Sequence, residues 1–293
     1  MTELNEMVLP VVWSVVHRVL EADREMPEDE LVACLTPTGL IQRENQSSSR
    51  HVGPSVRALE ALGLLENVDG KLRLVMRGVD EAAFRFEAAR HLLSIPNGTD
   101  PWEERPESKR LEYDLQVAVA WFCLQGIESG LSTFPAAEDR LMKQLGADRK
   151  LLRDSAPYNT LERWIEWLGL GGFTTIAGVR LLVPDPTPLV RFALDDLVPS
   201  GTYVSMPEFL DRAAVIFPWL PHGALGEAVA AGLREVPDAS AEEKRAPECL
   251  SLALVRLEIE GEIALEPGDD PRTRVLLSLG GSERLAVARI TRR

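Results

Sequence analysis

Residues 47–76 read SSSRHVGPSVRALEALGLLENVDGKLRLVM, and this stretch decides the fold that the sequence predicts. Val56, Leu59 and Leu62 recur at every third position, so they share one face of a predicted helix. Gly63 ends that helix, because glycine takes the left-handed conformation after a helix at low cost. Asp69-Gly70 is a strong signal for a two-residue turn, so a β-hairpin is predicted to follow.

The hairpin has one apolar and one basic face, because Leu72 and Leu74 alternate with Lys71 and Arg73. Two further helices are predicted before it, at Pro10–Ala22 and at Leu31–Leu35. Three helices followed by a hairpin are the order of a winged helix-turn-helix unit. The alternative is a plain helix and hairpin that bind no ligand.

The clearest linker is the segment Ile95–Ser108, IPNGTDPWEERPES, which is rich in proline. It predicts an N-terminal winged helix at 1–94, a linker at 95–110, a second winged-helix-like unit at 111–186 and a third at 187–293. The predicted fold class is therefore mainly α with small β-hairpins, arranged as tandem winged helix-turn-helix units. A chain of 293 residues has room for two or three domains.

Three glycines indicate an internal repeat, because Gly63, Gly169 and Gly261 each end a predicted helix. The residues four positions before them are all apolar: Leu59, Ile165 and Leu257. A hairpin is predicted after each glycine, the second turning at Ala177-Gly178 and the third joining Ile263–Leu265 to Arg274–Leu279. The alternative is that any helix, glycine and strand junction has this pattern.

The overall charge disfavours a non-specific DNA-binding surface. The formal net charge is -14 and the pI is about 4.9, whereas such binders are basic. A local basic patch is still compatible with this charge, and an acidic surface suits docking onto a basic partner protein. Hydrophobic residues make up 45% of the chain, enough for a real core.

No catalytic, metal or cofactor site is predicted. The cysteines, Cys34, Cys123 and Cys249, lie far apart within apolar helix patterns, which predicts three buried reduced thiols in a cytoplasmic protein. The four histidines lack the spacing of metal ligands. The early apolar run Val8–Val16 is too short for a membrane span and follows acidic residues, unlike a signal peptide. We therefore expect a non-enzymatic protein without a cofactor.

DNA contact, if present, is expected from the third helix and the wing of each unit. The predicted DNA-binding residues are Arg43, Arg50, Arg57, Lys71 and Arg73 in the first unit, and Arg149, Lys150, Arg153, Asn159 and Arg163 in the second. Further candidates are Ser48, Tyr158, Lys244, Arg245, Arg256, Arg272 and Arg274. Arg57 and Arg163 both stand six positions before their glycine. Seven basic and seven acidic residues lie between Pro135 and Asp185, so the second unit is neutral and these residues could equally be solvated.

Three later segments carry a resemblance to a known family: LERWIEWLGLGG (161–172), PDPTPLVRFALDDL (184–197) and SLALVRLEIEGEI (251–263). After a predicted winged helix, they resemble the DpdG-like component of bacterial DNA 7-deazaguanine modification and restriction islands. The resemblance implies an accessory protein of a phage-defence and DNA-modification cluster that works beside ATPase and nuclease-like partners. It transfers no active-site residue.

Three functions fit these observations. The first is an adaptor or DNA-recognition subunit of a defence complex, which would bind partner proteins and double-stranded DNA. The second is a pure protein–protein scaffold, similar in fold to the acidic tandem winged-helix subunits of chromosome-condensing complexes. The third is a transcriptional regulator with an effector pocket, for which Trp164, Trp167, Phe217 and Trp219 mark the place to search, although such aromatics are usually core residues.

Overall fold

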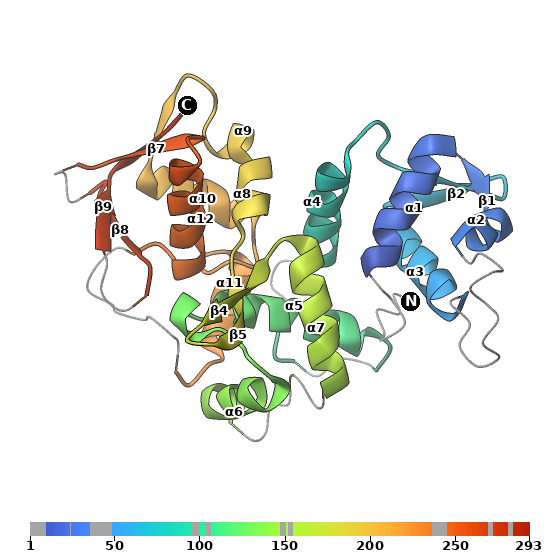
Figure 1. Cartoon of the computed structure of the whole chain (residues 1–293), viewed down its shortest axis with the longest axis horizontal. Helices are drawn as coiled ribbons and strands as arrows, with labels where there is room; N and C mark the ends of the chain where they lie inside the picture. The colour runs from blue at the N-terminus through green and yellow to red at the C-terminus, as the bar shows by residue number, and fades with distance from the viewer. Residues whose placement is uncertain are drawn as a thin grey trace. The chain divides into compact units, whose positions relative to one another are not determined.

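The computed structural model describes residues 10–23, 25–35, 49–94, 100–103, 107–146, 151, 155–235, 245–268, 272–280 and 284–293. Contacts divide the chain into two compact units. Unit 1 comprises Met1–Leu92 and Glu104–Leu115, and unit 2 comprises Leu93–Glu103 and Gln116–Arg293. Helices and short antiparallel sheets build both units, as Figure 1 shows, so the predicted class of a mainly α protein with small hairpins is confirmed. The predicted division into three domains stays a prediction.

Unit 1 places helices against a three-stranded sheet. Its elements are α1 (Pro10–Asp23), β1 (Met26–Pro27), α2 (Glu28–Leu35), α3 (Ser49–Ala61), β2 (Leu65–Val68), β3 (Lys71–Leu74) and α4 (Glu81–Leu92). The sheet order is β1-β3-β2. Trp13, Val56, Leu59 and Leu72 are fully buried between α1, α3 and β3. The Trp13 indole N–H donates to the Ser55 carbonyl oxygen at 3.1 Å, so the largest core side chain is also satisfied in its polar group.

The first part of unit 2 has a similar set of elements. They are α5 (Glu107–Cys123, which starts in unit 1), η2 (Ile127–Ser129), α6 (Phe134–Leu145), α7 (Ser155–Leu168), β4 (Gly171–Ile176) and β5 (Val179–Pro184). The hairpin β4–β5 turns at Ala177-Gly178, as the sequence predicts. Leu131 exchanges both backbone hydrogen bonds with Leu182 of β5, at 2.9 and 2.7 Å. This bridge ties the segment before α6 to the hairpin.

The remainder of unit 2 follows β5. Its elements are α8 (Thr187–Phe192), α9 (Leu194–Leu197), β6 (Tyr203–Ser205), α10 (Met206–Ile216), α11 (Ala224–Ala231), α12 (Glu248–Ile259), β7 (Ile263–Glu266), β8 (Val275–Ser278), β9 (Arg284–Val287) and β10 (Arg289–Arg292). The sheet order is β6-β10-β7, and β8 pairs with β9.

The third predicted hairpin is wrong. β7 does not pair with β8, because its partner is the C-terminal strand β10, with Ile263 opposite Arg292. The hairpin β8–β9 lies between the two strands in sequence. Ile290 of β10 is fully buried, whereas its neighbours Arg289 and Thr291 are more exposed. That alternation gives β10 one apolar face for the core.

One connection recurs three times. A short strand or bridge residue stands before a helix and pairs with the last strand of the hairpin or sheet that follows. The pairs are Met26 with Leu72, Leu131 with Leu182, and Val204 with Ile290. The first and third copies also share a local sequence, because Met-Pro-Glu occurs at 26–28 and again at 206–208, where the strand passes into the helix. The predicted repeat therefore extends beyond its glycines.

The three glycines end their helices in the same way, as predicted. Gly63, Gly169 and Gly261 have φ of 70°, 70° and 80°, in the left-handed region. At each of them the next residue donates its backbone N–H to the carbonyl five positions earlier: Leu64 to Leu59, Leu170 to Ile165 and Glu262 to Leu257. These bonds define a Schellman motif, which satisfies carbonyls that the helix leaves free.

The prediction of three buried thiols is wrong for Cys34. Cys123 and Cys249 are buried, whereas Cys34 is exposed. Cys34 lies near the end of α2, of which only Leu31 is buried among the helix residues. Such a short helix buries a narrow face, and Cys34 falls outside it.

Candidate nucleic-acid and protein interfaces

The side chains of five of the ten predicted DNA-binding residues are not described. Four of these residues lie outside the described part of the chain: Arg43, Arg149, Lys150 and Arg153. The further candidates Ser48 and Lys244 also lie outside it. Arg50 lies in the first turn of α3, but its side chain is not described. Of the ten predicted DNA-binding residues, the structure describes the side chains of Arg57, Lys71, Arg73, Asn159 and Arg163.

Arg57 occupies the solvent-facing side of α3. Val56 and Leu59 on the opposite side are fully buried, and Arg57 is exposed. The Arg57 guanidinium lies beside Gly53, one turn earlier in the helix, because a Cβ built on Gly53 would be 3.4 Å from Arg57 Nη1. Arg57 forms no ion pair with another described residue. It is thus available to an anionic partner.

The two basic residues of the predicted wing in unit 1, Lys71 and Arg73, are each paired with a carboxylate. Lys71 Nζ lies 2.9 Å from Glu25 Oε1, and Arg73 Nε lies 2.5 Å from Glu66 Oε1. Hydrogen bonding to Glu25 raises the pKa of Lys71, and hydrogen bonding to Lys71 lowers the pKa of Glu25. A phosphate would have to compete with these carboxylates, so the wing of unit 1 offers no net positive charge.

In α7 the predicted residues separate into two groups. Asn159 and Arg163 are exposed, as a contact residue requires. Tyr158 is 2% exposed and lies against Phe134, with ring centroids 6.1 Å apart, so its proposed role in DNA contact is wrong. Burial raises the pKa of the Tyr158 hydroxyl, which is the expected effect for a phenol in the core. Glu162 and Glu166 flank Arg163 on the helix, and this surface is therefore not basic.

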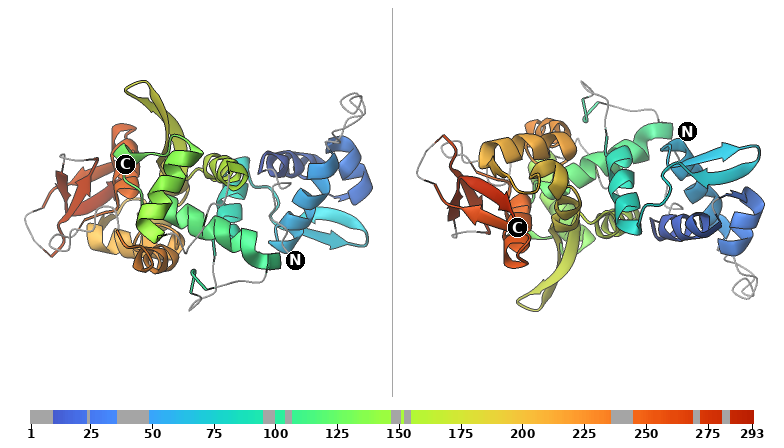
Figure 2. Two further views of the ribbon diagram at one scale, coloured as in Figure 1. Left: turned by 90° about the horizontal axis from the view of Figure 1, so that it is seen from below. Right: turned by 90° about the horizontal axis from the view of Figure 1, so that it is seen from above.

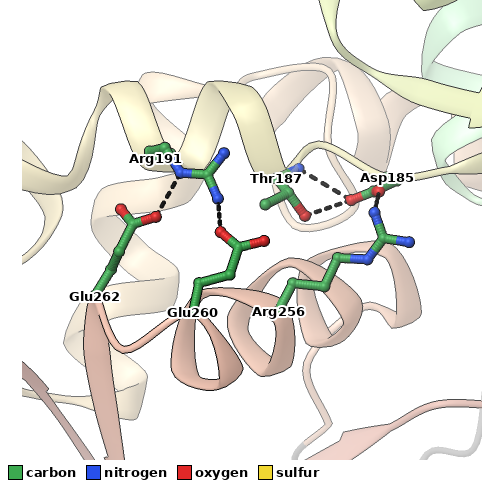
Figure 3. Close-up of polar contacts among 6 residues, drawn as sticks. All are labelled: Asp185, Thr187, Arg191, Arg256, Glu260 and Glu262. Atoms are coloured by element: carbon green, nitrogen blue, oxygen red, sulfur yellow. Dashed lines mark hydrogen bonds and ion pairs between the residues drawn. The ribbon is translucent and has the colours of Figure 1, made fainter.

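The helix α12 uses its charged residues within the protein, as Figure 3 shows. Arg256 is paired with Asp185, which also accepts hydrogen bonds from the backbone N–H of Thr187, at 3.1 Å, and from its hydroxyl. Arg191 of α8 donates to Glu262 at 2.6 Å and is also paired with Glu260. The two clusters join α8 to α12, so Arg256 is not free for the DNA contact predicted for it.

Sequence reasoning missed this polar network, although one local signal for it exists. Asp185 stands two residues before the start of α8, and Pro188 lies in the first turn. An acidic residue followed by proline near a helix start is typical of a capped N-terminus. Nothing local indicates the partner Arg256, which lies 71 residues further along the chain.

The proposed effector pocket is not at the aromatic residues. Trp164, Phe217 and Trp219 are at most 1% exposed, and Trp167 is 8% exposed. Trp164 and Trp167 contact each other edge to face, as do Phe217 and Trp219. They are core residues, and none lines the two cavities described next.

Two cavities of moderate size lie among the described residues of unit 2. One, of about 220 Å³, lies among Cys123, His222, Arg245 and Glu248. Glu248 Oε2 accepts a hydrogen bond from the Ile127 backbone N–H at 2.8 Å beside it. The other, of about 310 Å³, lies between the hairpin β4–β5 and α12. Burial raises the pKa of the Cys123 thiol well above its usual value, so the nucleophilic thiolate form is disfavoured in the first cavity.

Among the described residues, no group of three His, Cys, Asp or Glu side chains has a geometry that could hold a metal ion. None of the helices that the structure describes has both the length and the apolar character needed to cross a bilayer.

The molecule is thus a mainly α protein with a repeated helix and hairpin arrangement. The DpdG-like family model matches residues 2–271, and the chain belongs to this family. Comparison with curated proteins gave no match, and comparison with solved structures gave none either. The family resemblance drawn from the sequence is therefore confirmed, and it places the protein in the setting of DNA-modification and defence islands.

Proposed function

We propose that this protein is a non-enzymatic adaptor of a defence or DNA-modification complex, and that its three repeated arrangements are winged-helix units. They would dock partner proteins, as in the scaffold hypothesis. The carrying observation is that three cations predicted to face nucleic acid, Lys71, Arg73 and Arg256, are instead paired with carboxylates of their own unit. A net charge of -14 supports basic protein partners over DNA.

Co-expression with the other proteins of such an island tests the adaptor. We expect the tagged chain to co-purify with at least one partner at about 0.15 M salt, and the complex to weaken at higher salt, because charged surfaces are screened. A chain that elutes alone with every partner would contradict the adaptor function.

A second function, direct contact with double-stranded DNA through α3, rests on Arg57. It is exposed and forms no ion pair with another described residue, unlike the wing cations. Under this proposal Arg57→Glu abolishes duplex binding, whereas Arg163→Glu, on a helix face flanked by Glu162 and Glu166, weakens it less. Phosphate contact would also make affinity fall by about one log unit per log salt for each phosphate neutralised. No binding to any duplex at low salt would refute DNA contact and leave the adaptor.

A further inference from the structure

The open edge of β4 is the longest uncharged strand edge in the part of the chain that the structure describes. Its six residues, GGFTTI, pair only with β5 there. The other edges are shorter or carry a charge or a proline, such as Glu66 in β2 or Arg284 in β9. Proteins usually protect an edge with charge, proline or a bulge, because free N–H and C=O groups pair with other chains. In Figure 2 the yellow-green hairpin projects from the rest of its unit.

The register identifies which backbone groups face outward. Ile176 and Val179 flank the two-residue turn, so they form the first hydrogen-bonded pair, and such pairs alternate along the hairpin. Phe173 and Thr175 therefore direct their N–H and C=O groups to the open edge of β4. Leu182, opposite Phe173, agrees with this register, because it exchanges both of its bonds with Leu131 on the far side.

A groove adjoins this hairpin. The cavity of about 310 Å³ is lined by Thr174 and Ile176 of β4, Val183 of β5 and Leu252 of α12, with Glu128 and Arg256 among its polar residues. Ile176 is 47% exposed, so part of its apolar side chain is open to a partner. Gly172 adds room, since a Cβ built there would meet nothing within 4 Å. Alternate side chains of a strand added to β4 would point toward this face.

We propose that β4 is a docking strand for an extended segment of a partner protein, which pairs with Gly171–Ile176 and places alternate apolar side chains over the groove. This deepens the adaptor function proposed above and rests on it. Asp185 and Arg256 neutralise each other, so Glu128 leaves the groove with a net negative charge. The docking segment would therefore carry a Lys or Arg that points toward Glu128. A second copy of this chain is disfavoured as the occupant, because each copy carries a net charge of -14.

The test uses the full-length chain and a displayed library of random peptides about ten residues long, which exceeds the length of a typical strand. Selected peptides should alternate apolar residues and include a basic one. Thr175→Pro removes an outward N–H without removing a bond to β5, and proline is tolerated at such an edge. It should weaken peptide binding about tenfold or more, whereas Thr175→Ala, which keeps the N–H, should leave binding within about twofold.

Hydrogen exchange gives a second readout on the same complex. Peptide binding should slow exchange of the Phe173 and Thr175 amides and leave those of β2 unchanged. Failure to recover any peptide, or equal binding by wild type and Thr175→Pro, would overturn the docking strand. Peptide binding that depends on Thr175 in a chain that co-purifies with no island protein would instead refute the adaptor and leave the docking strand standing.

Discussion

Asp185 joins three segments through one carboxylate. It accepts two hydrogen bonds from Thr187 at the start of α8 and one from Arg256 of α12, while its side chain is only 13% exposed. A nearly buried acceptor is costly to remove, because the donors that it satisfied lose their partner without regaining full access to water. Asp195 offers a contrast, since it also pairs with an arginine, Arg292, but is 78% exposed.

Asp185→Ala should therefore lower the free energy of unfolding by about 1–3 kcal/mol. The matched variant Asp195→Ala should change it by less than about 0.5 kcal/mol, as is usual for exposed ion pairs. Urea denaturation followed by circular dichroism measures both. Equal effects from the two variants would show that the Asp185 cluster does not stabilise the junction of α8 and α12.

Glu81 makes the stability of the fold depend on pH in the acid range. A hydrogen bond from Ser14 is the largest cause that lowers the pKa of Glu81 to about 2, and Arg85 and Arg18 lower it further against the effect of burial. A carboxyl whose pKa is lower in the folded state stabilises the fold above its unfolded pKa. That contribution is lost as pH falls from about 4.5 towards 2.

Glu81→Gln should thus destabilise the protein at neutral pH by about 1 kcal/mol, a value discounted because the site is partly open to solvent. The difference from wild type should shrink progressively below pH 4.5, become small near pH 2, where Glu81 is half protonated, and vanish only below that pH. Denaturation curves at a series of pH values measure this difference. A difference that does not change with pH would mean that the ionised carboxylate of Glu81 adds no stability.

At the scale of elements, the helix-ending glycines offer a clean comparison. A Cβ at Gly63 or Gly261 would meet nothing within 4 Å, so the cost of alanine there is conformational alone. At Gly169 a Cβ would also lie 3.2 Å from the Pro188 Cβ. Gly172 is a matched control, because it has the same open space without a positive φ.

Gly63→Ala and Gly261→Ala should each cost about 1 kcal/mol of stability, since a left-handed conformation is unfavourable for residues with a Cβ. Gly169→Ala should cost more, because Pro188 must also shift. Gly172→Ala should be neutral or slightly stabilising, because it restricts the unfolded chain. Thermal and urea unfolding of the four variants rank these costs, and a destabilised Gly172→Ala would contradict the ranking.

Local sequence signals predicted the helices and strands better than they predicted which strands and side chains pair with each other. The first two hairpins could be predicted because each strand pair is joined by a two-residue turn, Asp69-Gly70 or Ala177-Gly178. The third could not, because β7 pairs with β10 and the two strands enclose another hairpin that alternates equally well. The pairing of the predicted wing cations with carboxylates could not be predicted for the same reason. Nothing near Lys71 indicates Glu25, which lies 46 residues away and compensates its charge.

At the scale of the whole molecule, two electrostatic effects oppose each other. The chain carries 46 acidic and 32 basic residues, so its excess negative charge repels itself in the folded state. Its surface also holds exposed ion pairs such as Arg18–Glu81 and Lys71–Glu25, which salt weakens. Exposed pairs contribute little individually, so self-repulsion should be the larger effect.

Salt should therefore stabilise the free protein and weaken its complexes. Raising NaCl from about 0.02 to 0.2 M shortens the screening length several-fold and should raise the unfolding midpoint by about 2 °C. The same change should reduce affinity for a basic partner, because there the screened interaction is attractive. Differential scanning fluorimetry and titration of a co-purified partner measure the two trends. A midpoint that falls with salt would mean that the ion pairs outweigh the repulsion. The excess negative charge would then not destabilise the folded chain. The electrostatic argument for a basic partner protein would be weakened accordingly.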